Sequence, residues 1–305
     1  MTAATIAIPR RRARRRLSIG RGIAWAYVIG FLVVTIFPFL WILRTSLSNN
    51  YALDTNPSSV MPVGFTWGPF ERALGIGTAE LSRAQGGSGA SLDVLLFLRN
   101  SVIYAGLMTL CVIFFSSIAA YSFARLQWRG RNLVFSIFFC ALLVPGILTL
   151  LPNFVLIRNL HLTNSFAGLI LPGALFSAFS IFFLRQFMLG LSSEIEDAAL
   201  IDGAGQLRVL FWITMPMSRG PMTTLAILTF INTWNDYFWP LLIANDPSVR
   251  PLTLALGVFQ QSSPQAMPDW AGLMAATLVA ALPMLVLFAV FGRRVVNSLG
   301  ITGLR

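Results

Sequence analysis

The sequence contains no lysine and few charged residues of any kind. Only 11% of its 305 residues are charged while 56% are apolar, and the mean hydropathy is +0.74. Soluble domains usually carry about a quarter charged residues, so this scarcity excludes a soluble enzyme and a disordered chain. One histidine and two cysteines, both in apolar runs, leave little from which to build a metal cluster, a disulfide framework or an enzyme site. The composition predicts an all-α integral membrane protein.

The absence of lysine has a second consequence. The phosphate-binding loop of nucleotide-hydrolysing proteins needs a Lys after its glycines, and this sequence cannot supply one. Any ATP-driven step must therefore be powered by another chain, and no cofactor is expected on this one.

Six apolar runs are long enough to cross a membrane, which requires about 20 residues each. They cover residues 22–43, 100–124, 132–157, 162–184, 220–245 and 270–292, and only the fifth contains an acidic residue, Asp236. Six transmembrane helices place both termini on one side. Several runs contain proline, which removes a helical hydrogen bond and bends a helix. These bends indicate either kinked helices around a cavity or ordinary transmembrane proline.

The distribution of arginine orients the helices. With the termini inside, the inner segments hold 16 of the 22 arginines and the outer segments hold 6, and cytoplasmic segments are the ones enriched in basic residues. We therefore predict both termini to be cytoplasmic. The basic run at residues 10–16 resembles a nucleic-acid arm in charge alone, but its place before the first span favours an anchor at anionic lipid. No nucleic-acid partner is expected.

This topology divides the chain into a membrane domain and its flanking segments. Residues 1–21 form a cytoplasmic basic tail, 22–292 the six-helix domain and 293–305 a cytoplasmic C-terminal tail. Extracytoplasmic loops are expected at 45–98 and 245–268, and the first contains a Gly-rich tract at 86–89 that is typical of a mobile linker. The inner segment 185–219 is too long for a simple connection and holds four of the 11 acidic residues.

The segment 185–219 carries signals for two short helices. Ser193 followed by Glu196 has the spacing of a capping box, so a helix should start there. Gly203 should end it, and a second helix should run from Leu207 to Ile213 before Pro216 stops it. Four residues of the first helix share a nearly smooth face that another protein could approach: Ile195, Ala198, Ala199 and Asp202.

The same residues resemble a family motif. Permease subunits of bacterial ABC importers share the pattern Glu-Ala-Ala, three residues, Gly, nine residues, Ile, one residue, Leu-Pro. This sequence has Asp197-Ala198-Ala199, then Gly203 after three residues, and Ile213-Thr214-Met215-Pro216 after nine more. Asp197 replaces the usual Glu, with Glu196 beside it, and Met215 replaces Leu. Either acidic residue could therefore make the family's acidic contact.

Other stretches resemble the carbohydrate-uptake group of these importers, of the maltose type with six helices. They are 182–187, 201–204, 234–241 and the tail 293–300. The resemblance implies the ABC type I importer permease fold in the bacterial inner membrane. It also implies four partners: a second permease subunit, a cytoplasmic ATPase dimer that binds the ATP, an extracytoplasmic solute-binding protein, and a sugar substrate. The ATPase-coupling residues would be Glu196, Asp197, Ala198, Ala199, Asp202, Gly203, Ile213 and Pro216.

The candidate substrate path lies in the fifth apolar run. Asn232, Trp234, Asn235 and Asp236 combine aromatic faces with polar side chains, which is what sugars require. Alternatively, Trp and Tyr at this position mark the membrane interface, where aromatic residues are common. Two other functions compete: the same permease with glycerol phosphate or an amino acid as cargo, and an ion-coupled secondary transporter. The latter usually has ionisable groups deep in the membrane, whereas the charges here lie at the ends of the runs.

Overall fold

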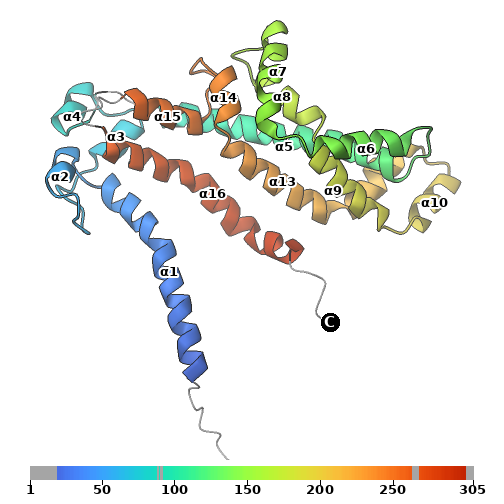
Figure 1. The fold of residues 1–305 in the computed structure, drawn as a ribbon, viewed down its shortest axis with the longest axis horizontal. Helices are drawn as coiled ribbons and strands as arrows, with labels where there is room; N and C mark the ends of the chain where they lie inside the picture. Colours follow the sequence, from blue (N-terminus) through green and yellow to red (C-terminus); the bar gives the residue numbers. More distant parts are fainter. Residues whose placement is uncertain (1–18, 88, 90–91, 263–267, 300–305) are drawn as a thin grey trace, which may run out of the picture.

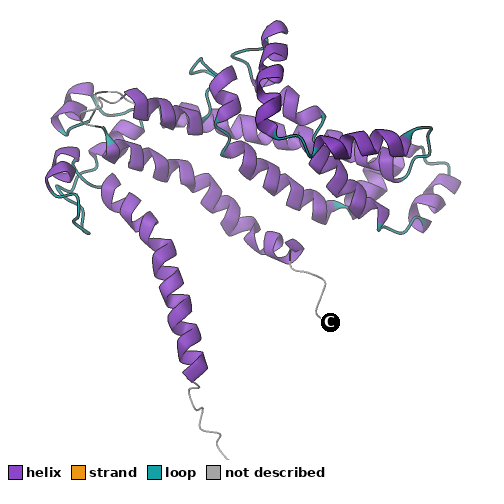
Figure 2. Cartoon of the chain, in the orientation of Figure 1, coloured by secondary structure: helices purple, strands orange, loops and turns teal. Residues whose placement is uncertain are grey.

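The computed structural model describes residues 19–87, 89, 92–262 and 268–299, and this part of the chain is helical with connecting loops and no strand (Figure 2). Both the basic run at 10–16 and residues 300–305 lie outside the described residues. The elements are α1 (Ile19–Ser46), α2 (Asn50–Thr55), α3 (Gly68–Ala73), α4 (Ala79–Ala84), α5 (Val94–Ala124), α6 (Arg131–Ala141), α7 (Gly146–Asn159), α8 (Phe166–Leu175), α9 (Ala178–Leu189), α10 (Glu194–Ile201), α11 (Gln206–Val209), the π-helical turn η1 (Leu210–Thr214), α12 (Met215–Met217), α13 (Arg219–Trp234), α14 (Phe238–Ile243), α15 (Leu252–Ser262) and α16 (Trp270–Leu299).

The six apolar runs are helical, but three of them are broken. By length and composition, the described helices provide three candidate spans, within α1, α5 and α16, or up to five when each bent pair counts as one. The pair α6–α7 bends by 103° and the pair α8–α9 by 44°. The first break precedes Pro145, because a proline disfavours helical geometry in the residue before it. The fifth run does not count among the candidate spans, because α13 has only 16 residues and ends at Trp234.

Helix α5 is the central element of the bundle. It packs against α8, α9 and α13, and its residues take part in three separate apolar clusters along its length, through Phe97, Tyr104 and Tyr121. Small side chains such as Ala105, Ser117 and Ala120 are fully buried along it. Helices in lipid associate through close packing at small residues, because the surrounding tails are as apolar as the interface. Helix α5 therefore connects both ends of the molecule.

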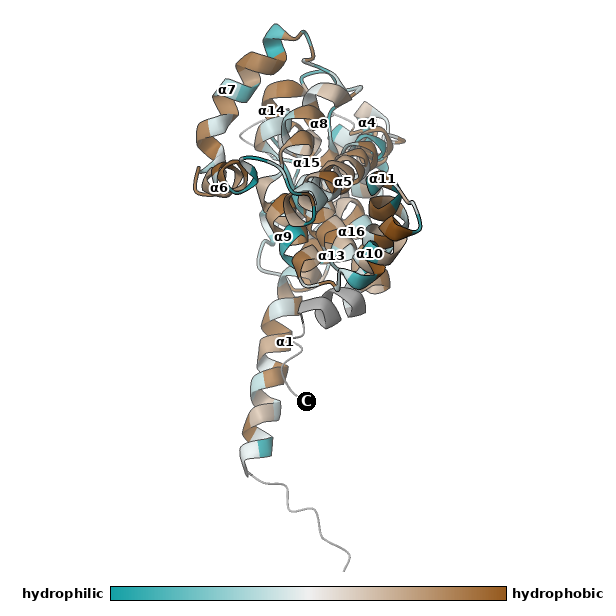
Figure 3. Cartoon of the chain, turned by 90° about the vertical axis from the view of Figure 1, so that its right-hand side faces the viewer, coloured by the Kyte–Doolittle hydropathy of each residue, from teal (hydrophilic) through white to brown (hydrophobic). Residues whose placement is uncertain are grey.

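Helix α1 diverges from the bundle. Residues 20–40 are exposed, and burial begins only at Trp41, where the helix approaches α16 (Figure 1). Figure 3 shows α1 extending away from the other helices with a largely apolar surface. Such a surface requires lipid or another apolar helix around it.

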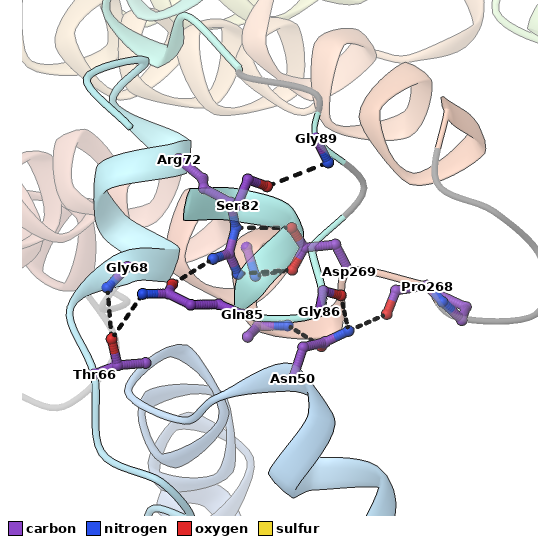
Figure 4. Close-up of polar contacts among 12 residues, drawn as sticks. Asn50, Thr66, Gly68, Arg72, Ser82, Gln85, Gly86, Gly89, Pro268 and Asp269 are labelled. Carbon is purple, nitrogen blue, oxygen red and sulfur yellow. Dashed lines mark hydrogen bonds and ion pairs between the residues drawn. The ribbon is translucent and has the colours of Figure 1, made fainter. Parts of the chain in front are cut away.

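The segment 45–98 forms three short helices and is tied to the start of α16 by buried polar groups (Figure 4). Arg72 forms an ion pair with Asp269 at 2.9 Å, with side-chain exposures of 2% and 0%. Gln85 accepts a hydrogen bond from Arg72 at 2.9 Å. Asn50 donates to the carbonyls of Gly86 and Pro268 at 2.8 and 2.9 Å. The described glycines of the 86–89 tract thus lie in a packed network, and the prediction of a mobile linker is wrong for them.

We expect Gly87→Ala to destabilise this network. A Cβ atom at Gly87 would lie 2.6 Å from Ser82 Oγ and 2.9 Å from Asp269 Oδ2, so these groups would have to separate, at a cost of about 1–3 kcal/mol. The effect is measured by heating the purified protein in detergent and following the loss of folded protein with temperature. Gly77→Ala is the control, because its nearest atom would be 3.4 Å away. Equal stability of the two variants would contradict the packing described here.

Candidate functional site

Residues 190–218, which connect α9 to α13, form an angled pair of helical segments that we call the elbow. The first, α10, follows Ser193 directly and has Glu194, Glu196 and Asp197 in its first turn, where the helix dipole favours negative charge. It ends at Ile201 with Asp202 as its C-cap, and Gly203 has a φ of +84°. A positive φ favours glycine, which has no Cβ to clash with the following carbonyl. The predicted helix and its glycine end are confirmed.

The helix begins as predicted, but the side-chain hydrogen bonds of the predicted capping box do not form. Ser193 makes no side-chain capping hydrogen bond, and Glu196 points inward, with 4% of the residue exposed. Its carboxylate lies 2.9 Å from Nε of Arg125, at the end of α5, and accepts a hydrogen bond from Thr214 Oγ1 at 3.0 Å. A buried carboxylate requires a charged or hydrogen-bonding partner, and these two residues provide both.

Two further hydrogen bonds hold the elbow against α5. Tyr121 donates to Oε1 of Gln206 at 2.7 Å, and Arg125 donates to the carbonyl of Leu191 at 2.9 Å. Leu210 and Ala204 join the apolar cluster around Tyr121. The elbow is thus attached to the end of α5 through both of its helical segments.

The exposed face of the elbow differs from the predicted one. Ile195, Ala198 and Asp202 are exposed as predicted, but Ala199 is half-buried against the chain's own core. Two large apolar side chains of the elbow are also exposed, Ile201 at 86% and Trp212 at 78%. Sequence reasoning missed these two. Their signal was available: bulky apolar residues in a polar segment between two spans.

The second helical segment continues beyond its predicted end. It runs through α11, η1 and α12 to Met217, so Pro216 does not stop it. Pro216 lies in the first turn of α12, after the π-helical turn in which the Met215 N–H bonds to the Leu210 carbonyl. Ile213 is half-buried and Pro216 is exposed.

The structure divides the four predicted substrate-path residues among three cavities. Asn232 lines a cavity of about 370 Å³ together with Ser177, Ser180, Thr229 and Thr233, which we call the Asn232 cavity. Asp236 lines one of about 320 Å³ with Tyr104, Thr149, Asn153 and Trp239, which we call the Asp236 cavity. Trp234 and Asn235 line a third, largely apolar cavity of about 620 Å³ beside α16.

The division follows from helix geometry. Successive residues of a helix point about 100° apart, and α13 ends at Trp234, so neighbours at this end face different helices. Asp236 lies just beyond the helix, where its carboxylate accepts a hydrogen bond from the Tyr104 hydroxyl of α5 at 3.0 Å. The four residues therefore line no common cavity, although each of them lines one, and their role in the substrate path stays a prediction.

Comparison with known families decides the class of protein. The model of the family described as binding-protein-dependent transport system inner membrane component matches residues 112–299, more than half of the chain. The chain belongs to this family. The match includes the elbow and all four predicted path residues. The protein is therefore a multi-pass permease of the bacterial inner membrane rather than an enzyme, and such permeases work with ATPase and binding-protein partners.

Individual relatives agree with this assignment. The permease is 32% identical to a sulfoquinovosyl glycerol transport system permease protein of Agrobacterium fabrum, over 90% of each chain. It is 29% identical to a diacetylchitobiose uptake system permease protein of Streptomyces coelicolor, over 90% of this chain and 86% of the relative. An sn-glycerol-3-phosphate transport system permease protein of Yersinia pestis is 30% identical, over 89% and 92%.

A solved structure supports the fold. The permease matches a chain of a bacterial ABC transporter involved in the import of the acidic polysaccharide alginate, with a TM-score of 0.75 and 21% identity. The match covers 89% of this chain and 95% of the other. The permease thus shares its overall fold with a chain of an ABC importer, while the type I arrangement of six transmembrane helices stays a prediction.

Proposed function

We propose that this permease lines one half of the translocation path of an importer for a sugar or oligosaccharide. The Asn232 and Asp236 cavities support this cargo, because both are lined by hydroxyl and amide groups that can exchange hydrogen bonds with sugar hydroxyls. Trp239 adds an aromatic face. Two relatives named for diacetylchitobiose and sulfoquinovosyl glycerol also favour a carbohydrate.

Glycerol phosphate is the alternative cargo, since one relative is named for it. Phosphate groups are usually bound by Arg or Lys. Among the residues that line these two cavities, Asp236 is the only charged one, and its carboxylate would repel a phosphate. This lining is the observation that carries the proposal of a hydroxyl-rich cargo in preference to a phosphate ester.

We place the contact with the ATPase dimer on the exposed face of the elbow. Ile201 and Trp212 offer exposed apolar surface there, which in a soluble environment is typical of a protein interface. Asp197 is exposed beside them, whereas Glu196 is engaged with Arg125. Of the two acidic residues, Asp197 is therefore the one available for the family's acidic contact.

A second permease subunit would complete the path. Residues 22–40 of α1 carry no charge and are exposed, so they are free to pack against lipid and another subunit. The solute-binding protein would deliver the cargo at the opposite end from the elbow, where α2–α4 lie (Figure 1).

We expect six membrane crossings with both termini in the cytoplasm, the broken pair α13–α14 being the fifth crossing. Reporter fusions test this. Alkaline phosphatase, which is active only outside the cytoplasm, should be active when fused after Arg83 and inactive after Gly130 or Gly205. Strong activity after Gly205 would place the elbow outside the cell and contradict the proposed coupling.

Uptake by the complete importer in proteoliposomes tests the function, with ATP and the ATPase dimer inside and the binding protein outside. Neutral oligosaccharides should be accumulated only with ATP, and sn-glycerol 3-phosphate should not compete with them. Exclusive uptake of the phosphate ester would overturn the sugar proposal. Accumulation driven by an ion gradient without ATP would overturn the ATP-driven mechanism.

A further inference from the structure

The Asn232 and Asp236 cavities share a single pair of lining residues. Met108 of α5 and Gly173 of α8 line both the Asp236 cavity and the Asn232 cavity. On one side of this pair are Tyr104, Asn153 and Asp236, and on the other are Ser180, Thr229 and Asn232. The contact between Met108 and Gly173 thus lies between two chambers that each have polar groups in their lining.

Met108 lies directly on the backbone of Gly173. A Cβ atom at Gly173 would be 2.1 Å from Cε of Met108 and 3.6 Å from its sulfur. Any side chain at residue 173 would therefore occupy the position of the Met108 methyl group. The glycine thus forms the seat of this methionine.

The chemistry of methionine suits a movable barrier. Its unbranched side chain has three rotatable bonds and adapts to irregular surroundings at low cost. Met108 is half-buried, since the cavities leave space on both sides. A rotation about its side-chain bonds would carry the methyl group off Gly173 and join the two chambers.

The position of Met108 connects it to the elbow. It lies in α5, the continuous helix whose last turns hold the elbow through Tyr121 and Arg125. Its seat belongs to α8, which ends at Leu175 before the bend to α9. Movement of the elbow would therefore displace Met108 relative to a seat on a different, separately bent helix.

We propose that Met108 is a plug, seated on Gly173, that closes the passage between the Asp236 and Asn232 cavities in this conformation and leaves its seat during transport. This rests on the proposed function, since it assumes that the cavities belong to the translocation path. Met108 would be a selectivity residue that limits which solutes pass between the chambers.

Thiol labelling of the assembled importer tests the plug without any knowledge of the cargo. The native thiols are removed by Cys111→Ala and Cys140→Ala. In this background, Asn232→Cys reports on access to the Asn232 cavity, and Asn153→Cys reports on access to the Asp236 cavity. A membrane-impermeant methanethiosulfonate reagent is added outside right-side-out vesicles without nucleotide. Asn232→Cys should react about tenfold faster with Met108→Ala than with Met108, because truncation opens a gap, whereas Met108→Leu conserves the volume and should change little.

A second variant addresses the seat. Gly173→Ala should displace the Met108 methyl group and also accelerate labelling of Asn232→Cys, and it should add nothing in the Met108→Ala background, because the two substitutions remove the same contact. Normal labelling of Asn153→Cys and normal co-purification of the ATPase verify that each variant is folded and assembled.

Two outcomes separate the plug from the proposed function. Equal labelling rates for Met108→Ala and Met108→Leu, in an importer that transports normally, would overturn the plug. Failure of the unmodified importer to transport any solute with ATP would overturn the proposed function, while the labelling rates would still report whether Met108 separates the chambers.

Discussion

Gly203→Val should abolish transport and release the ATPase from the permease. The φ of +84° at Gly203 is left-handed, a conformation that costs other residues about 1–2 kcal/mol and is worst for β-branched ones. Valine would shift the backbone to negative φ and turn α10 away from the segment that follows. Because no atom lies within 4 Å of a Cβ built there, an internal clash would not explain the effect. Uptake and the amount of co-purified ATPase measure it.

Gly205→Val is the matched control. Gly205 lies in the same elbow and also has no atom within 4 Å of a built Cβ, but its φ of −72° and ψ of 158° are extended, which valine prefers. We expect Gly205→Val to retain the ATPase. Gly203→Asn should be intermediate, because asparagine tolerates the left-handed region. A normal ATPase content in Gly203→Val would contradict docking at the elbow.

Glu196→Gln should destabilise the permease by about 3 kcal/mol, the lower end of the range for breaking a buried ion pair, because the Arg125 side chain is partly exposed. The substitution leaves the guanidinium without its charge partner and loosens the elbow from α5. Heating in detergent and limited proteolysis at the elbow should both detect it. The double variant Glu196→Leu with Arg125→Met should lose less than either single change, since it leaves no unpaired buried charge.

Asp197→Asn is the companion experiment. Asp197 is exposed, so its substitution should change stability by no more than about 0.5 kcal/mol, yet it should weaken ATPase association. The two substitutions should therefore be detected by different assays: Glu196→Gln by the loss of stability, and Asp197→Asn by the weaker association with the ATPase. Equal destabilisation by both substitutions, or none by Glu196→Gln, would contradict the roles inferred from their burial.

Local patterns predicted much of this architecture. The apolar runs identified the segments that became helices, because about 20 uncharged residues in lipid must satisfy their backbone internally. The spacing from Asp197 through Gly203 to Pro216 located the elbow and its glycine turn, since helix ends depend on residues within one turn of each other. These signals require no knowledge of what packs nearby.

Such local patterns could not predict the contacts between segments that are distant in the sequence. Glu196 fits a capping box in sequence, but Arg125 and Thr214 bind it, and only the packing of α10 on α5 brings them close. Arg72 and Asp269 form their buried pair across 197 positions. Trp234 and Asp236 are two residues apart and line different cavities. The sequence by itself therefore determined the apolar helical segments, the end of α10 before Gly203 and the family, which depend on composition and short spacing. The tertiary structure decided which polar groups become partners, because a buried charge takes whichever partner the packed helices bring within reach.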